Sequence, residues 1–537
     1  MNRLSGNKNP ALARIVPYVF LSLAVFLAYA NIYHNEFLFD DIALIVNNQF
    51  LRDWRFLPAL LTTKLNAGSN IDGTYYRPMQ SLLYLGLFQM AGLSTIAFHL
   101  LNITLHAVNA CLVYALGLKL RFIRGAVFVA ALLWALHPLQ TEAVTYMSAT
   151  ADTLYTLFLL LAMIAVVPDF SLRRFAVSAP LILLCLLSKE EAVIAPLLAM
   201  GTLYFFSGKK ASQFSTYFRV GPWVAVVGIY LAVYCAMALM VEPAPVVQAQ
   251  AASSTAPISY APFASLALYA RLILWPFGLH MEHDFPAYAS VMHLPVLAGM
   301  GLIAVAGFQI MRPQSRVSEP FGWGLIWFAV ALLPVFCGEN IAYEHWLYVP
   351  LIGLFLGATQ SIALYAQKST SLKAVKRQRI VVIICTGCAC ALGFMTWRQN
   401  EVWHDPVALY SNVIASGEPA LKAHANLGNY YVEQGDLAKA MDEYESAVAN
   451  SGDTDVEAQH NIGVSLTMIQ KGLLTDEALA HFRRALAIDP NYYPTLTFLA
   501  DTYAAQGNLA DAAIYRTKAD ALQKRYKTFP GSSSPQP

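Results

Sequence analysis

The chain has 537 residues, of which 57% are hydrophobic and 13% are charged, whereas soluble proteins carry about 25% charged residues. This composition excludes an ordinary soluble globular protein and predicts an integral membrane protein with a smaller soluble part. The net charge is +2 and no concentrated basic surface is visible in the sequence, so we expect no nucleic-acid partner.

About eleven apolar runs are candidates for crossing the hydrocarbon layer of a bilayer. Together they predict an all-α, polytopic membrane domain over residues 1–396. No small-residue cleavage site follows the first run, so we expect a retained anchor helix rather than a removed signal peptide. The runs lie at 15–33, 96–118, 125–140, 151–167, 175–188, 191–206, 220–240, 291–311, 321–336, 346–366 and 380–396.

Basic residues gather at alternate connections between these runs. By the positive-inside rule the connections that carry them are cytoplasmic, which places the N-terminus inside and everything after Thr396 on the opposite, outer face. A further apolar run at 262–277 would break this alternation if it spanned, so we expect a re-entrant or surface segment within an outer loop at 242–290. The basic groups are Arg3/Lys8/Arg14, Lys119/Arg121/Arg124, Arg173/Arg174, Lys209/Lys210/Arg219, Arg312/Arg316 and Lys368 to Arg379.

The outer loop at 34–95 opens with two adjacent carboxylates, Asp40 and Asp41, between large apolar residues. The pair is either a solvated helix end or a functional site, in which a carboxylate accepts a proton from an alcohol or holds a divalent cation. Later in the loop, Pro78 keeps Arg77 out of the helical conformation and places its guanidinium at the start of an apolar helix. An arginine at a helix N-terminus can bind phosphate; the alternative is an interfacial aromatic belt around Tyr76 with a snorkelling arginine.

Other polar clusters fall on the same predicted face. Lys189 lies between carboxylates and two short apolar runs, where an ammonium is either internally paired or faces a cavity. The segment His280 to Asp284 has metal-ligand residue types without a fixed geometry, so a solvated loop is the other interpretation. The remaining polar residues of these clusters are His137, Glu142, Glu190, Glu344, His345 and Tyr348.

From Leu421 the pattern changes to helical repeats of 34 residues, with Gly428 at the eighth position of the first. A second unit begins near Val456 and contains about three inserted residues, and a third begins near Tyr493. We therefore expect about three tetratricopeptide repeats over 421–526, preceded by a connecting helix at 397–420 and followed by a disordered tail at 527–537. Such a solenoid presents a concave surface for a peptide or protein, here including Asn426, Tyr430 and Asn461.

Five motifs and the repeats resemble the transmembrane and tetratricopeptide-containing O-mannosyltransferase family and its bacterial relatives. The motifs are FDD at 39–41, YRPM at 76–79, HPLQTEAV at 137–144, SKE at 188–190 and EHWLYVP at 344–350. The resemblance implies a GT-C-like membrane domain that moves mannose or a similar hexose, with inversion, from a polyprenyl-phosphate carrier to a Ser/Thr hydroxyl of a protein. Where the family pattern has Glu-Arg, this chain has Glu344-His345.

The resemblance also implies roles for individual residues. Asp40 or Asp41 would be catalytic, Arg77 and Tyr76 would lie near the donor, and Lys189 or His345 near its phosphate. His137, Glu142, Glu190, Glu344 and Tyr348 would support them. The residues themselves leave the cofactor open: a divalent cation, Mg or Mn, would have Asp40, Asp41, His283 and Asp284 as its candidate ligands.

Two other functions stay open from the sequence. One is a non-catalytic membrane scaffold that assembles an envelope complex through its repeats, and the other is a transferase acting on a lipid-linked glycan. We find no P-loop, no dinucleotide fingerprint and no nucleophile elbow in the sequence, so a sugar donor is expected at the membrane face. The expected location is a bacterial inner membrane with the repeats in the periplasm, and an endoplasmic reticulum membrane is the alternative.

Overall fold

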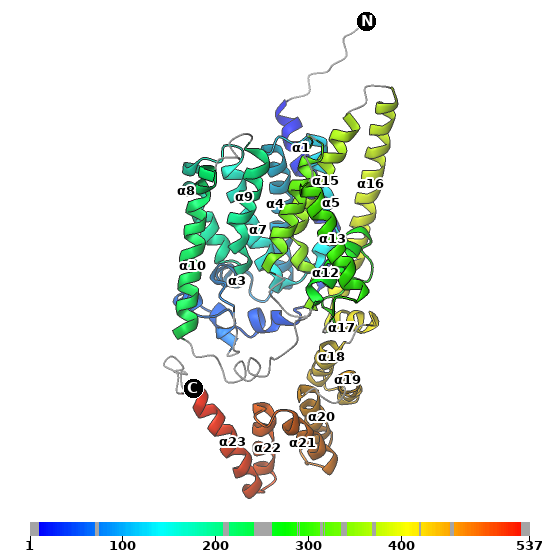
Figure 1. Cartoon of the computed structure of the whole chain (residues 1–537). Helices are drawn as coiled ribbons and strands as arrows, with labels where there is room; N and C mark the ends of the chain where they lie inside the picture. The colour runs from blue at the N-terminus through cyan, green and yellow to red at the C-terminus, as the bar shows by residue number, and fades with distance from the viewer. Residues whose placement is uncertain are drawn as a thin grey trace. The chain divides into compact units, whose positions relative to one another are not determined.

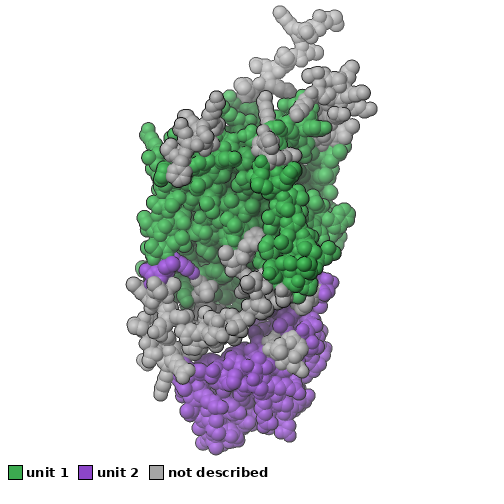
Figure 2. Space-filling view, in the orientation of Figure 1, with its two compact units in different colours: residues 1–233, 258–405 green, residues 234–257, 406–537 purple. Residues whose placement is uncertain are grey.

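The computed structural model describes residues 10–69, 75–207, 214–240, 260–286, 288, 290–311, 315, 317–334, 341–367, 372–417, 420–451 and 456–527. Within these ranges the regular secondary structure is helical apart from one pair of two-residue strands (Figure 1), which confirms the all-α prediction. The chain divides into two compact units, residues 1–233 with 258–405 and residues 234–257 with 406–537 (Figure 2). Most of the predicted tail, 528–537, lies outside the described residues, as do several of the basic groups used to orient the membrane domain.

Each predicted apolar run coincides with a helix in the structure. The helices between the N-terminus and Asn400 are α1 (Pro10–Ala28), α2 (Leu57–Thr62), α3 (Pro78–Ala91), α4 (Thr95–Lys119), α5 (Arg124–Ala135), α6 (Thr141–Thr145), α7 (Thr150–Val166), α8 (Leu172–Leu186), α9 (Ala195–Phe206), α10 (Gly221–Met240), α12 (Ala261–Leu274), α13 (Leu294–Met311), α14 (Glu319–Leu332), α15 (Pro350–Gln367) and α16 (Leu372–Asn400).

Four stretches of the described chain are long and apolar enough to cross a membrane: Thr95–Lys119, Met147–Val166, Tyr217–Ala236 and Leu294–Met311. A fifth candidate is the bent pair Arg124–Ala135 and Pro138–Thr145, whose axes differ by 56°. The bend falls at Pro138, because proline lacks the N–H that would continue the helix. The chain is thus a multi-pass membrane protein by length and composition, and the larger number of spans stays a prediction.

Close contact between α14 and α15 depends on glycine. A Cβ added to Gly324 would lie 2.5 Å from the carbonyl oxygen of Gly353, and one added to Gly357 would overlap the carbonyl oxygen of Pro320. Small residues let two helix backbones approach in this way, and the gain is van der Waals contact. Buried Trp327 of α14 also joins the two elements, because its Nε1 donates to Val349 O, directly before α15, at 3.0 Å.

Residues 34–69 and 75–95, predicted to form an outer loop, make a packed structure rather than an extended connection. Short 3₁₀ turns and α2 enclose a small apolar core around Leu44, Leu51 and Tyr84. Helix α3 starts at Pro78 with Arg77 in the N-cap position, as the sequence predicts. The only strands among the described residues, β1 (His283–Asp284) and β2 (Ile341–Ala342), pair antiparallel and bring two segments distant in sequence together.

The second unit contains α17 (Pro406–Ala415) and the helix pairs of the repeats. These are α18 (Leu421–Glu433) with α19 (Leu437–Ser451), α20 (Val456–Ile469) with α21 (Asp476–Ile488), and α22 (Tyr493–Ala505) with α23 (Leu509–Lys527). Three residues separate the helices of the first and third pairs, whereas six separate α20 from α21, which confirms the insertion. In place of the connecting helix predicted at 397–420, the structure has the end of α16, a turn at Glu401–Trp403 and α17.

Glycine at the eighth repeat position has a packing role. A Cβ on Gly463 would lie 2.8 Å from the Phe482 ring, and one on Gly428 would overlap the Tyr444 ring. The two helices of the first repeat and those of the second therefore meet through a glycine and an aromatic side chain, as the repeat pattern predicts.

Candidate functional site

The two adjacent aspartates have different surroundings. Asp41 is buried, and its carboxylate accepts hydrogen bonds from Leu38 N at 3.0 Å, from Ser148 N at 2.7 Å and from Ser148 Oγ. Burial raises the pKa of Asp41 to about 7, although the three donors oppose that rise. Phe39, directly before the pair, has a φ of 47°, a conformation that needs support from its surroundings in a residue other than glycine. Asp41 therefore acts as the anchor of this turn.

Asp40 is the exposed member of the pair. Its backbone N–H donates to the hydroxyl of Tyr146 at 3.1 Å, and the Tyr146 ring stacks on Trp403 with 5.4 Å between centroids. Nearby protein atoms displace enough water to raise the pKa of the Asp40 carboxyl, Tyr146 and Arg77 oppose the rise, and Glu282 adds to it. Asp40 is thus an accessible carboxylate within electrostatic reach of a buried arginine.

Arg77 forms a two-point ion pair with Glu190. Its Nε donates to Glu190 Oε2 at 3.0 Å and its Nη2 to Oε1 at 2.6 Å, while the guanidinium lies over the Tyr75 ring at 4.4 Å. Burial alone lowers the pKa of Arg77, but Glu190 and further carboxylates raise it above its ordinary value. The Arg77 side chain is 13% exposed, and its Nη1 group has no hydrogen-bond partner in the described part of the chain.

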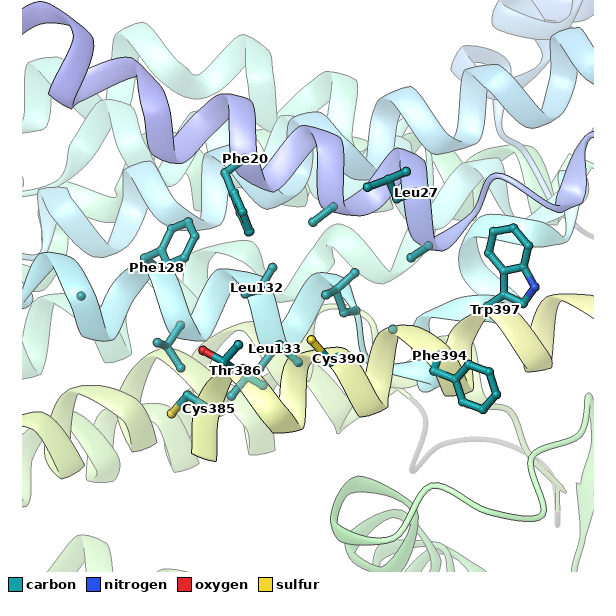
Figure 3. Close-up of a pocket in the computed structure, with 17 residues that line it drawn as sticks. Phe20, Leu27, Phe128, Leu132, Leu133, Cys385, Thr386, Cys390, Phe394 and Trp397 are labelled. Atoms are coloured by element: carbon teal, nitrogen blue, oxygen red, sulfur yellow. The ribbon is translucent and has the colours of Figure 1, made fainter. Parts of the chain in front are cut away.

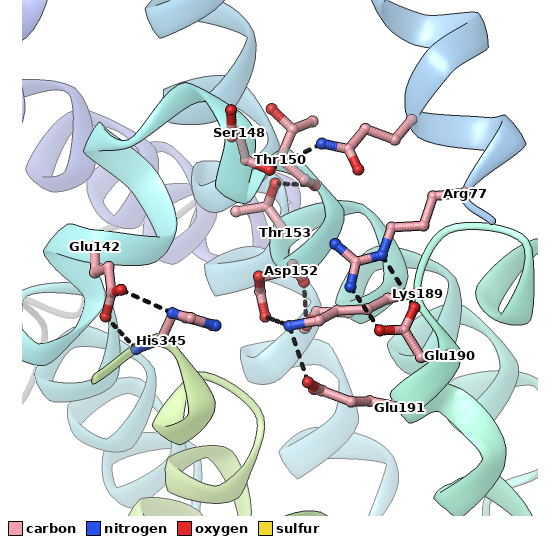
Figure 4. A network of polar contacts seen from close by, with 12 residues as sticks. Arg77, Glu142, Ser148, Thr150, Asp152, Thr153, Lys189, Glu190, Glu191 and His345 are labelled. Carbon is pink, nitrogen blue, oxygen red and sulfur yellow. Dashed lines mark hydrogen bonds and ion pairs between the residues drawn. The ribbon is translucent and has the colours of Figure 1, made fainter. Parts of the chain in front are cut away.

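Lys189 lies deeper in the same network (Figure 4). Its ammonium is 2.7 Å from Asp152 and 3.0 Å from Glu191, and only 4% of the side chain is exposed. Burial lowers the pKa of Lys189, and the two carboxylates more than reverse that effect. Removing one partner of such a buried pair typically costs about 3–5 kcal/mol, so the network is a rigid element of the fold.

His345 completes the set of cations. Its backbone N–H donates to Glu142 Oε2 at 2.8 Å, and its Nδ1 lies 2.8 Å from Glu142 Oε1. Burial lowers the pKa of His345, but Glu142 and Asp152 raise it further than burial lowers it. Asp152 thereby links His345 to Lys189. The structure brings together Arg77, Lys189, His345, Glu142 and Glu190, which come from four of the five motifs.

The strand pair β1–β2 organises a neighbouring acidic cluster. Glu344 is buried and accepts from His280 N at 2.9 Å and lies 3.1 Å from His283 Nε2. The Tyr343 hydroxyl donates to Glu282 at 2.9 Å. Among the described residues no group of three or more His, Cys, Asp or Glu side chains is placed to hold a metal ion. The candidate ligands Asp40, Asp41, His283 and Asp284 therefore do not form one site.

Three predicted site residues have contacts that hold the fold. The Tyr76 hydroxyl donates to Leu61 O at 2.7 Å, within the outer loop. His137 is buried, accepts from Leu139 N and contacts Ile273 O at the bend after α5. The Tyr348 hydroxyl is buried 2.7 Å from His106 Nδ1, between α15 and α4.

Two important partners carry no local signal in the sequence. Tyr146 and Ser148 meet Asp40 and Asp41 across more than 100 residues of chain. Tyr146 and Ser148 directly follow the motif at 137–144. Including the few residues after that motif among the candidates would have identified them.

The repeats show a polar contact between neighbouring units. Asn461 Nδ2 donates to Asn429 Oδ1 at 3.0 Å, and the Tyr444 hydroxyl donates to the same oxygen at 2.6 Å. Asn426 and Tyr430 are half-buried on α18. Asn429 was not among the predicted groove residues, although it lies one turn after Asn426.

Comparison with known proteins supports this division of the chain. Residues 475–514 match the family model described as tetratricopeptide repeat. The chain is 23% identical over 450 residues to the protein O-mannosyl-transferase F38B6.6 of Caenorhabditis elegans, covering 80% of this chain and 62% of that protein. It is 22% identical over 517 residues to the human protein O-mannosyl-transferase TMTC3, covering 86% of this chain and 54% of that protein.

Among solved structures, the oligosaccharyltransferase of Archaeoglobus fulgidus matches with a TM-score of 0.40 and 15% identity, over 72% of this chain and 55% of that one. The chain thus spans between 54% and 62% of the length of the two curated relatives. The resemblance indicated by the motifs and repeats is confirmed: over most of its length the chain is similar in sequence to TMTC-type protein O-mannosyl-transferases, and it contains a tetratricopeptide repeat.

Proposed function

We propose that the chain is a membrane glycosyltransferase that moves a hexose, mannose or a similar sugar, from a polyprenyl-phosphate carrier to a Ser/Thr hydroxyl of a protein. The observation that carries this proposal is the exposed carboxylate of Asp40, which lies within electrostatic reach of the buried, carboxylate-held cation Arg77. The names of the relatives supply the class of reaction. The polyprenyl phosphate and the outer membrane face come from the sequence resemblance and the charge alternation.

In the proposed reaction Asp40 is the general base. It accepts the proton of the acceptor hydroxyl as the oxygen attacks the anomeric carbon, and the bond from that carbon to the phosphate oxygen breaks. Attack from the side opposite the leaving group inverts the anomeric centre. The carrier leaves as polyprenyl phosphate with the electron pair of the broken bond.

Arg77 is the proposed contact for the leaving phosphate. Glu190 occupies Nε and Nη2, so the guanidinium is held in one orientation with Nη1 as the donor for an anion. Donors fixed before the reaction stabilise developing charge without reorganisation. Lys189 is nearly enclosed and bound to two carboxylates, so we assign it to the electrostatics of the network rather than to direct contact.

Substitution of the two aspartates tests the proposal. Asp40→Asn should lower sugar transfer by about 10²–10⁴-fold, the usual contribution of a general base, in membranes supplied with a polyprenyl-phosphate hexose and a Ser/Thr acceptor. Asp53→Asn is the matched control, because Asp53 is a surface residue of the same loop paired only with exposed Arg55.

Asp41→Ala should act differently. It leaves three donors without their acceptor, which costs about 1–3 kcal/mol for each buried group, so the thermal midpoint of the purified chain should fall. Full transfer by the Asp40→Asn variant would overturn the assignment of Asp40. Normal assembly of a protein complex by a chain without any transfer activity would favour the scaffold.

A further inference from the structure

A long apolar groove lies between α1, α5 and α16 of the first unit (Figure 3). Its volume is about 620 Å³, and its walls are almost entirely hydrocarbon. Figure 3 shows Phe20 and Leu27 on one wall, Leu132 on the floor, and Phe394 and Trp397 on the opposite wall. The groove is within the range of small-molecule sites, about 300–1,000 Å³, and none of the proposed transfer residues lines it.

The dimensions of the groove match one hydrocarbon chain. Its floor extends along α5 from Gly125 to Leu136, which is about 17 Å at the rise of an α-helix. That length is about half of the ~30 Å hydrocarbon layer, the depth of a single leaflet. Leu27 and Phe394 on the rims are exposed, so the groove opens towards the bilayer.

The two ends of the groove differ in charge. At the Gly125 end, Arg124 is exposed at the N-terminus of α5 and has no acidic partner among the described residues. Exposed Arg121 precedes it. A helix N-terminus and an unpaired arginine both favour an anion.

At the Trp397 end the polar groups satisfy one another. Asn31 Nδ2 donates to Trp397 O at 2.8 Å, Asn400 Nδ2 donates to Ala28 O at 3.0 Å, and Thr396 Oγ1 donates to Leu136 O at 2.9 Å. Arg398 on that side is 3.5 Å from Glu401. Among the described side chains, a cation without an acidic partner therefore lies at the Arg124 end of the groove and not at the Trp397 end.

We propose that this groove is a binding site for one acyl chain of an anionic phospholipid, with the phosphate head at Arg124 and the chain end near Trp397. The site is separate from the proposed sugar donor, because α5 begins at the Arg124 end and leads at its other end to His137 and the motif that holds Glu142. The lipid covers the exposed side of α5 and holds α1 and α16 against it.

The experiment uses the full chain in phosphatidylcholine nanodiscs that contain a trace of phosphatidylglycerol with a photoreactive acyl chain. Cross-links should fall on peptides of α1, α5 and α16, and a photoreactive phosphatidylcholine should label these peptides roughly fivefold less, the effect of one arginine near a membrane surface. Arg124→Gln should remove that difference. Equal labelling of the natural chain by the two lipids would overturn the anionic head-group site.

Gly393→Leu places a side chain in the groove, since Gly393 lines it and a Cβ there meets only Leu136 of the floor, at 3.7 Å. It should reduce labelling by phosphatidylglycerol about tenfold, a loss equivalent to about 1.4 kcal/mol. Gly387→Leu is the matched control on the same helix, since a Cβ there meets nothing within 4 Å and Gly387 does not line the groove.

Gly125→Leu blocks the groove from the α5 side, so the test does not depend on one variant, and thermal unfolding verifies the fold of each. Labelling of both blocked variants at the level of the natural chain would refute the site. Stronger competition by unlabelled polyprenyl phosphate than by unlabelled phosphatidylglycerol would refute the phospholipid assignment.

Discussion

At the residue scale, the main division is between charged groups that can meet a substrate and charged groups that hold those in place. Lys189 and Asp152 are enclosed, and Lys189 is paired with both Asp152 and the half-buried Glu191. Arg77 shares this environment but retains an unused donor group, and Asp40 is open to solvent. Asp40 and Asp41 are neighbours in the sequence, yet Asp40 can meet a substrate, whereas Asp41 is buried and holds its turn in place.

His345 makes the stability of the fold depend on pH. Its folded pKa is raised above the ordinary value, since Glu142 and Asp152 outweigh the effect of burial. A raised pKa means that the pair with Glu142 stabilises the fold fully below about pH 6.5 and that this contribution is lost as pH rises through the folded pKa.

The thermal midpoint of the purified chain should therefore fall as pH rises above about 6.5, the ordinary pKa of histidine, and His345→Gln should make the fall shallower. His34→Gln is the control, because the His34 side chain is exposed. An identical pH slope in the natural chain and in His345→Gln would contradict this role of the imidazole.

At the element scale, glycine determines how closely the helices pack. Gly324, Gly353 and Gly357 bring α14 and α15 into backbone contact. In the repeats, Gly428 and Gly463 accept the aromatic side chains of the following helices. Glycine thus allows close helix packing in both parts of the chain. In lipid the gain is van der Waals contact alone, whereas in water the burial of apolar surface adds to it.

Gly357→Leu should separate α14 from α15. The new side chain would overlap the backbone of Pro320, and overpacking of this kind typically costs about 1–3 kcal/mol, so the thermal midpoint in detergent should fall. Gly307→Leu on α13 is matched in chemistry but meets nothing within 4 Å. Equal midpoints for the two variants would show that the close approach contributes little to stability.

At the scale of the whole molecule, two units with separate cores are joined in one chain. The repeat unit is acidic, with 14 acidic against 7 basic residues from Leu421 to Asp520, and it has the architecture of a protein-binding solenoid. We expect it to raise the local concentration of the acceptor rather than to take part in bond formation.

Disruption of the repeats should therefore separate two activities. Gly463→Leu forces a side chain into the Phe482 ring and should reduce transfer to an intact protein acceptor about tenfold or more, the lower range of a lost tethering effect. Transfer to a short Ser/Thr peptide at saturating concentration should stay near normal. The control is Gly472→Asn, because Gly472 occupies a left-handed turn position that asparagine tolerates. If Gly463→Leu reduced transfer to the protein and to the peptide equally while the membrane unit stayed intact, the tethering role would be contradicted.

The sequence by itself determined the features that depend on local or periodic patterns. Apolar runs located the helices because a chain in lipid must satisfy its backbone hydrogen bonds within each segment. The 34-residue period located the repeat helices and the insertion before α21, because each repeat packs mainly on its neighbours. Pro78 located the start of α3, since proline fits the first turn of a helix.

Only the tertiary structure decided what each polar residue does, because the deciding partners are distant in sequence. Asp41 is buried and accepts a hydrogen bond from Ser148, 107 residues away, whereas Asp40 is exposed. The Tyr348 hydroxyl contacts His106, 242 residues away, in the core and does not lie with the other predicted site residues. The burial and hydrogen bonding of a charged group depend on all of its neighbours in space. A sequence pattern shows only the neighbours that are close along the chain.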